Sequence, residues 1–196
     1  MTYPTSARAG DKIYKINTDF RVAIKCSEVI DDETINDYER FLAIIYLLYG
    51  DDGLKDRENH IELMEKASQY LSCGKQRENR NNEKPDMDYV QDEGLIRSSF
   101  QYDYKYDPYE MEYCHWYKFS NDLNNLSNSE MGNCCVLNRV RQIRNYDINK
   151  VKDAKERDKL QKAKDYYALK THEKPREFTE EEIRNMEEYD RLMGGG

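Results

Sequence analysis

The amino-acid sequence predicts a mostly α-helical protein, a single-domain helical bundle with a short N-terminal β-hairpin and a detachable C-terminal helix. Apolar residues recur at helical spacing in several segments, and glycines or polar capping residues bound most of those segments. Only residues 12–16, KIYKI, lean toward a strand. Hydrophobic residues make up 38% of the chain and charged residues 36%, so we expect a modest core under a highly charged surface.

The first elements follow from turn and capping signals. Gly10-Asp11 separates residues 6–9 from 12–16, which predicts a hairpin. Asn17 or Thr18 is expected to cap a helix that ends near residue 29. Thr34 is expected to cap the next helix, with Asp37 at the capping-box position. That second helix has the clearest amphipathic stripe and should end at Gly50; its stripe consists of Tyr38, Phe41, Leu42, Ile45, Leu48 and Tyr49.

The middle of the chain combines two helices with a polar insert. Asp56 is expected to cap a third helix that stops at Gly74. Residues 75–86 offer almost no apolar side chains and are predicted to be a flexible insert. A further helix is expected over residues 87–102. Asp107-Pro108 then provides an N-cap followed by proline at the first helical position.

The helix expected after Pro108 carries the aromatic packing centre of the chain. Nine of the twenty residues from 100 to 119 are aromatic, and the only Trp is among them. Aromatic rings dominate both cores and protein interfaces, so this block indicates either a core or a surface that grips another polypeptide. The predicted packing centre consists of Tyr109, Tyr113, Trp116, Phe119 and Leu123.

The last elements complete a helical body over residues 1–169. Ser127 or Ser129 is expected to cap a helix that extends to residue 143, and a charged helix should follow over residues 150–168. Residues 170–196 are expected to form a linker, a helix that begins at Thr179, and a glycine tail. The terminal segment 173–191 carries four basic and eight acidic residues, which gives it a net charge of −4.

Composition and motifs point away from several classes of function. A net charge of −8 disfavours general nucleic-acid binding, and no apolar run is long enough to span a membrane. The five cysteines include no CxxC pair, which argues against a structural zinc site. No phosphate loop, nucleophile elbow or metalloprotease motif is present. We therefore expect no cofactor, no metal and no enzymatic activity.

A basic stretch lies near the end of the body. Residues 139–170 contain eleven Lys or Arg and five Asp or Glu, a local charge of +6 within an acidic chain. Such asymmetry favours an acidic partner, or it balances the protein's own acidic part with mixed i,i+4 pairs. The candidate partner-binding residues are Arg139, Arg141, Arg144, Lys152 and Lys155.

Several segments together resemble a known family. INTDFR at residues 16–21 opens the first helix, HWYKF occupies residues 115–119, and YYAL at residues 166–169 follows a Lys-rich helix. Over about residues 12–169 the chain resembles the gene product fifteen family of tailed phages and prophages of Gram-positive bacteria. Tyr117 stands where that family often has a second Trp.

The resemblance implies a function that composition alone does not. It implies a tail-assembly chaperone that binds the tape-measure protein in the cytoplasm of the infected bacterial host. The tail-tube protein is a second expected partner. Such a chaperone is expected to act on a long non-contractile tail and to be missing from the mature virion. The main alternative is a structural tail or connector subunit retained in the virion, and a weaker one is an accessory enzyme. Self-association is a further expectation.

Overall fold

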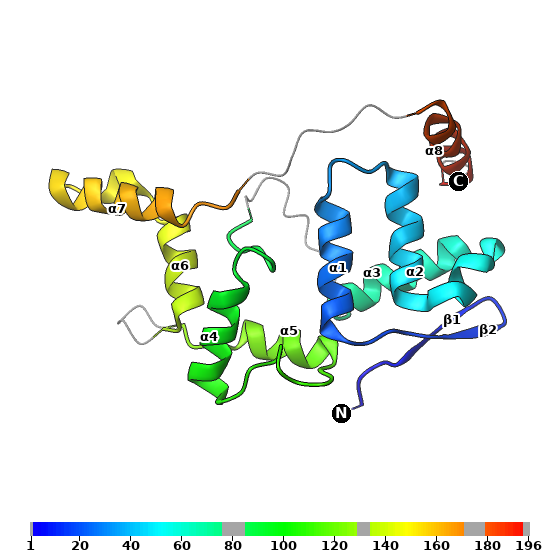
Figure 1. The fold of residues 1–196 in the computed structure, drawn as a ribbon, viewed down its shortest axis with the longest axis horizontal. Coiled ribbons are helices and arrows are strands. Elements are labelled where there is room, and N and C mark those ends of the chain that lie inside the picture. The colour runs from blue at the N-terminus through cyan, green and yellow to red at the C-terminus, as the bar shows by residue number, and fades with distance from the viewer. Residues whose placement is uncertain (1, 76–84, 129–133, 171–178, 194–196) are drawn as a thin grey trace. The chain divides into compact units, whose positions relative to one another are not determined.

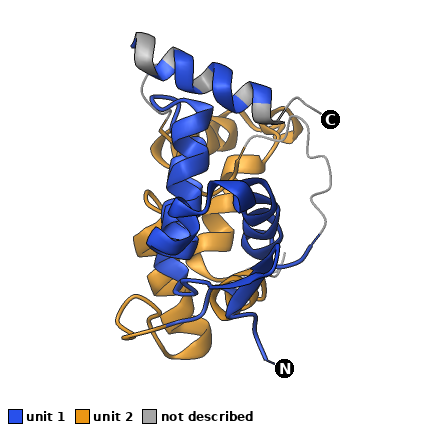
Figure 2. Cartoon of the chain, turned by 90° about the vertical axis from the view of Figure 1, so that its right-hand side faces the viewer, with its two compact units in different colours: residues 1–79, 114–117, 172–196 blue, residues 80–113, 118–171 orange. Residues whose placement is uncertain are grey.

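The computed structural model describes residues 2–75, 85–128, 134–170 and 179–193. It is mostly helical with one two-stranded antiparallel hairpin, which confirms the predicted fold class (Figure 1). The chain divides into two compact units. Unit 1 comprises residues 1–79, 114–117 and 172–196, and unit 2 comprises residues 80–113 and 118–171 (Figure 2). That residues 1–169 form one domain and that residues 170–196 are detachable remain predictions.

The hairpin of unit 1 lies where the sequence places it. Strands β1 (Ser6–Ala9) and β2 (Lys12–Lys15) pair antiparallel, with Ala7 opposite Tyr14. Gly10 in the turn has φ +53°, a conformation that glycine adopts without steric cost. Its N–H donates to Oε2 of Glu62 over 2.8 Å, which ties the turn to helix α3.

Helices α1 (Phe20–Asp31) and α2 (Asp37–Lys55) lie side by side and antiparallel (Figure 1). Asp19, rather than Asn17 or Thr18, caps α1 by accepting the N–H of Arg21 over 2.9 Å. The expected Thr34 cap of α2 is wrong. Asn36 forms the capping box with Glu39, while Thr34 donates to Asp32 two residues before it.

Gly50 interrupts α2 with φ 66°, so the predicted end of the regular helix is a kink, after which one more turn follows. Helix α3 (His60–Leu71) then begins after a 3-10 turn over Arg57–Asn59. Asp56 does not cap α3, because its carboxylate accepts hydrogen bonds from Lys12, Tyr14 and Asn59 instead.

The core of unit 1 lies between α1, α2 and α3. Helix α8 (Glu180–Met193) belongs to the same unit and contacts α2. Buried apolar residues of the three core helices include Phe20, Ala23, Cys26, Ile44, Ile45, Leu48, Leu63 and Ala67.

Unit 2 contains α4 (Glu93–Tyr104), most of α5 (Trp116–Asn124), α6 (Val136–Asn145), a 3-10 turn η2 (Ile148–Lys150) and α7 (Ala154–Tyr166). The helices expected over residues 87–102 and 150–168 are therefore shorter than predicted. The buried apolar residues of unit 2 include Ile96, Phe100, Phe119, Leu123, Leu126, Leu137 and Val140.

The helix expected from Pro108 begins only at Trp116. The carboxylate of Asp107 accepts the N–H of Tyr109 over 2.9 Å and closes a local turn, and its other oxygen binds Arg97 over 2.7 Å. Asp107 is thus engaged in a turn and an ion pair rather than in a helix start. The flexible insert, the linker and the glycine tail were predicted over segments that include residues 76–84, 171–178 and 194–196, which lie outside the described residues.

A pH dependence of stability follows from Cys26, which is fully buried in α1. Burial raises the pKa of its thiol to about 12. An unfolded chain ionises that thiol near pH 8.5, so the folded state retains a proton that the unfolded state loses. Stability from this group is complete below about pH 8.5 and falls by about 1.4 kcal/mol per pH unit as the pH rises toward 12.

Urea unfolding measured between about pH 8 and pH 11 checks this effect. The slope of unfolding free energy against pH should be shallower for Cys26→Ala than for the wild type. Because the substitution also removes packing, the slopes are compared and not the absolute stabilities. Equal slopes would contradict the assignment.

Candidate partner interface

The aromatic residues of unit 2 form a core around Phe119. Phe100 stacks on the Phe119 ring with 5.4 Å between centroids, and Tyr109 meets that ring edge-on at 6.4 Å. Phe119 is fully buried, and Leu123, one turn further along α5, is 7% exposed. These residues therefore build the inside of unit 2 and leave little ring surface for a partner.

A polar cluster of Tyr106, Lys118 and Asp122 lies beside that core. The Tyr106 hydroxyl donates to Oδ2 of Asp122 over 2.5 Å, and Nζ of Lys118 donates to both partners. Burial and the bond to Asp122 raise the pKa of Tyr106 to about 12. Although burial opposes it, the hydrogen bonds to Asp122 and Tyr106 raise the pKa of Lys118. Both groups hold their protons at neutral pH, so neither is poised as a general base.

Residues 114–117 pack into unit 1. The N–H of Phe20 donates to the Cys114 carbonyl over 2.9 Å, and the N–H of Trp116 donates to the Thr18 carbonyl over 2.8 Å. The Trp116 side chain is 5% exposed, and its Nε1 donates to the carbonyl of Leu71 over 3.1 Å. Trp116 thereby joins the start of α1 to the end of α3.

His115 uses both ring nitrogens inside the same arrangement. Its Nδ1 accepts the N–H of Tyr117 over 3.0 Å. Nε2 must then carry the proton, and it donates to the carbonyl of Pro4 over 3.1 Å. The ring also stacks on Tyr3 at 4.8 Å. With both nitrogens engaged, this histidine holds the N-terminal segment and is not arranged as a base or a ligand.

The predicted packing centre is thus divided. Trp116 serves unit 1, whereas Tyr109, Phe119 and Leu123 lie in unit 2. Tyr113 is at the surface with 51% of its area exposed, which corrects the expectation for that residue. Helix α5 begins only at Trp116, so the helical spacing that aligned Tyr113 with Trp116 does not apply to residues 113–115.

Arg144 is the most deeply buried cation of the basic stretch. Its side chain is 8% exposed and forms two bonds with Asp92, which is 2% exposed: Nη1 to Oδ2 at 2.6 Å and Nη2 to Oδ1 at 2.7 Å. The guanidinium also donates to the carbonyls of Asp86 and Tyr167, over 2.9 and 2.6 Å. These bonds are internal to unit 2, so Arg144 is not the exposed partner contact that the sequence suggested.

The other four candidates differ in exposure. Arg141 is half-buried, with Nε 3.1 Å from Asp86. Arg139, Lys152 and Lys155 are exposed. Arg141 is therefore already engaged within unit 2, and three of the five predicted residues remain accessible.

Helix α7 extends this accessible basic surface. None of its thirteen residues is buried. Lys155, Lys159 and Lys162 are spaced four and three residues apart, which places them on one face of the helix, and all three are exposed. We call Lys152, Lys155, Lys159 and Lys162 the α7 basic face. Figure 1 shows α7 meeting one end of α6 within unit 2 and extending away from it.

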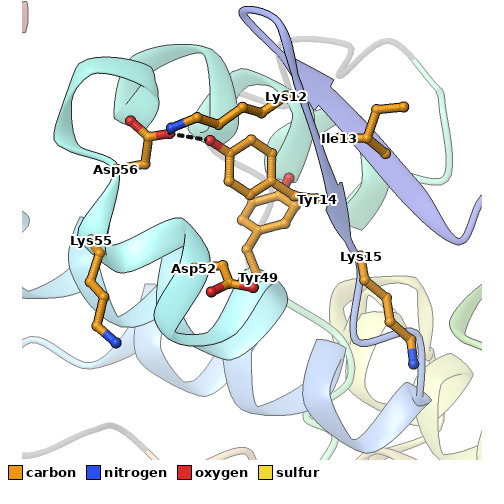
Figure 3. Close-up of a pocket in the computed structure, with 8 residues that line it drawn as sticks. All are labelled: Lys12, Ile13, Tyr14, Lys15, Tyr49, Asp52, Lys55 and Asp56. Carbon is orange, nitrogen blue, oxygen red and sulfur yellow. Dashed lines mark hydrogen bonds and ion pairs between the residues drawn. The ribbon is translucent and has the colours of Figure 1, made fainter.

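A surface hollow of about 550 Å³ lies between β2 and the end of α2 in unit 1 (Figure 3). Lys12 and Tyr14 both donate to the carboxylate of Asp56. Hydrogen bonds from Lys12, Tyr14 and Asn59 lower the pKa of Asp56 to about 2. The carboxylate is therefore ionised at neutral pH, and its Oδ2 accepts hydrogen bonds from three structural donors, Lys12, Tyr14 and Asn59. Its lining residues are Lys12, Ile13, Tyr14, Lys15, Tyr49, Asp52, Lys55 and Asp56.

Within the described ranges, no group of three or more His, Cys, Asp or Glu side chains is placed to hold a metal ion. No helix in the same part of the chain is both long and apolar enough to cross a membrane.

Comparison with known proteins identifies the family. A family model described as bacteriophage Gp15 protein matches residues 4–169. Neither the curated proteins nor the solved structures contain a match. Because the matched region covers most of the 196 residues, the chain belongs to the bacteriophage Gp15 protein family, which confirms the resemblance seen in the sequence.

The residues that carried this resemblance serve as internal connections. Residues 16–21 and 114–117, far apart in the sequence, are joined through Thr18, Phe20 and Asp19. In the YYAL segment, the carbonyl of Tyr167 accepts a hydrogen bond from the guanidinium of Arg144, which forms the buried ion pair with Asp92. In this chain these segments therefore help to hold each unit together.

The Trp116 contact can be tested by Trp116→Ala. Loss of the buried ring and of its bond to Leu71 should lower the unfolding free energy by about 3–5 kcal/mol. Urea denaturation measures the loss. Tyr113→Ala, three residues away and exposed, is the matched control and should change stability by less than about 0.5 kcal/mol. A urea midpoint of Trp116→Ala equal to that of the wild type would show that the indole does not support the fold.

The ion pair can be tested by Arg144→Ala. The substitution leaves the Asp92 carboxylate buried without its cation, which should cost about 3–5 kcal/mol. Arg139→Ala, on the same helix and exposed, should cost less than about 0.5 kcal/mol. The two urea midpoints are compared directly, and equal midpoints would refute the structural role of Arg144.

Proposed function

We propose that this member of the bacteriophage Gp15 family is a tail-assembly chaperone that binds the tape-measure protein in the cytoplasm of the infected bacterium, during assembly of a long non-contractile tail. Family membership supports a phage protein, and the resemblance described above supports the tail-assembly role. The tail-tube protein is a second proposed partner. The proposal requires no cofactor, since the binding of one protein by another rests on surface complementarity.

The observation that carries the proposal is the α7 basic face. Because no residue of α7 is fully buried, its lysines are available to a partner. A row of exposed lysines suits an acidic or mixed-charge helix. Arg139 adds a further exposed cation on α6. The tape-measure protein is the proposed source of the acidic helix.

Mass spectrometry separates the chaperone from a subunit that stays in the virion. Purified virions and lysates of infected cells are compared for peptides of this chain. A chaperone should be abundant in the lysate and scarce in virions. A fixed copy number per virion would instead identify a structural tail or connector subunit.

Charge reversal tests the binding surface. A variant with Lys152→Glu, Lys155→Glu and Lys159→Glu should bind the tape-measure protein about tenfold more slowly at low salt, because exposed interface charges act mainly on the association rate. Binding of this variant should also depend less on salt. Surface plasmon resonance across a salt titration gives both quantities.

The matched control reverses three exposed lysines of unit 1, Lys15, Lys25 and Lys55. It changes the net charge by the same six units, from −8 to −14, so it isolates the position of the charges from their sum. The control should stay within about twofold of the wild type at each salt concentration. Identical salt profiles for the two triple variants would remove α7 as the binding surface.

A further inference from the structure

Helix α8 packs on one aromatic patch of α2. The ring of Tyr189 lies 5.2 Å from Phe41 and 6.4 Å from Tyr38, centroid to centroid. Phe41 also meets His60 edge-on at 5.8 Å and is only 6% exposed. We call Tyr38 and Phe41 the α2 aromatic face. Tyr189 is thus the anchor through which α8 covers this face.

Helix α8 also has a complete start of its own. Oγ1 of Thr179 accepts the N–H of Glu182 over 3.3 Å, and the Thr179 N–H donates to the Glu182 carboxylate over 2.6 Å. This reciprocal capping box satisfies two backbone groups without help from the body. A helix of fourteen residues is nevertheless marginal in isolation, so it depends on a surface to pack against.

Helix α8 is separated in the sequence from the helices of unit 1 that it joins. Residues 80–113 and 118–171 form unit 2, yet α8, which follows them, belongs to unit 1. The ring of Tyr189 contacts Tyr38 and Phe41 of α2. The family match ends at residue 169, so α2 belongs to the family body and α8 follows outside the match.

We propose that the α2 aromatic face is a docking surface for α8 of a second copy of this chain, so that two copies associate by exchanging their C-terminal helices. An α8 from a second copy makes the same contacts with α2 as an α8 from the same chain. The exchanged interface therefore needs no further shape complementarity. In the sequence, residues 171–178, which include Pro175, connect Lys170 to Thr179. This inference is independent of the proposed binding to the tape-measure protein.

The exchange predicts a defined concentration dependence. Docking within one chain benefits from an effective concentration in the range of about 1 mM, so the wild-type monomer should predominate in dilute solution. In a chain that cannot dock its own α8, docking within the chain no longer competes with docking between chains. Its free helix or its open face should then bind a second copy at much lower concentration.

Two full-length variants test this by complementation. Tyr189→Ala removes the anchor and leaves the α2 aromatic face open, whereas Phe41→Ala removes the face and leaves α8 free. Each variant alone should be monomeric by size-exclusion chromatography with light scattering at about 100 µM, and an equimolar mixture should form a 1:1 complex. Tyr38→Glu replaces Phe41→Ala if the latter fails to fold, because Tyr38 is only half-buried.

The double variant Phe41→Ala with Tyr189→Ala is the matched control, and it should pair with neither single variant. Circular dichroism confirms that each chain used is folded. A mixture of folded Tyr189→Ala and Tyr38→Glu chains that stays monomeric at about 100 µM overturns the proposal. A complex that also forms with the double variant overturns it as well, since association would then use another surface.

Discussion

The buried ion pair of Asp92 and Arg144 is the contact on which unit 2 depends. Asp92 accepts two bonds from the guanidinium and a third from the N–H of Asp88, so its carboxylate is satisfied despite being almost fully buried. Arg144 in turn reaches the carbonyls of Asp86 and Tyr167. Four parts of the chain thus meet at one pair: the turn before α4, the start of α4, the end of α6 and the residue after α7. Such a pair is stable only when every donor and acceptor is engaged, and this one is close to that condition.

The position of α7 rests on the same polar scaffold. No residue of α7 is fully buried, and only a few such as Leu160 and Ala163 are half-buried, so apolar packing contributes little to its position. Hydrogen bonds fix it instead: Arg144 binds the carbonyl of Tyr167, Lys164 binds the carbonyl of Tyr146, and Gln91 binds the carbonyl of Ala168. The α7 basic face is therefore presented by a helix whose own surface remains free for charge. The bond from the buried Arg144 to Tyr167 therefore helps to position the exposed lysines of α7.

Much of the fold could be predicted from local patterns, and the misses have physical causes. The hairpin and the stripe of α2 were correct because each depends on neighbouring residues. The helix expected from Pro108 failed because residues 114–116 pair with Thr18 and Phe20, a contact nearly one hundred residues away in the sequence. The misassignment of Arg144 was avoidable. Leu137, Val140 and Arg144 are spaced three and four residues apart, so Arg144 extends the buried side of α6, whereas Arg139 does not.

The chain has 17 tyrosines, which supply bulk in a sequence with only 38% hydrophobic residues. A tyrosine ring supplies core area, and its hydroxyl can satisfy a backbone carbonyl that the packing leaves open. Tyr49 donates to the Leu63 carbonyl over 3.0 Å, and Tyr104 donates to the Asp122 carbonyl over 2.9 Å. Apart from the exposed Tyr102 and Tyr113, the rings of residues 100–119 thus pack within each unit. In the INTDFR and HWYKF segments, Thr18, Phe20 and Trp116 are engaged inside unit 1, whereas Lys155, Lys159 and Lys162 of the Lys-rich helix remain exposed.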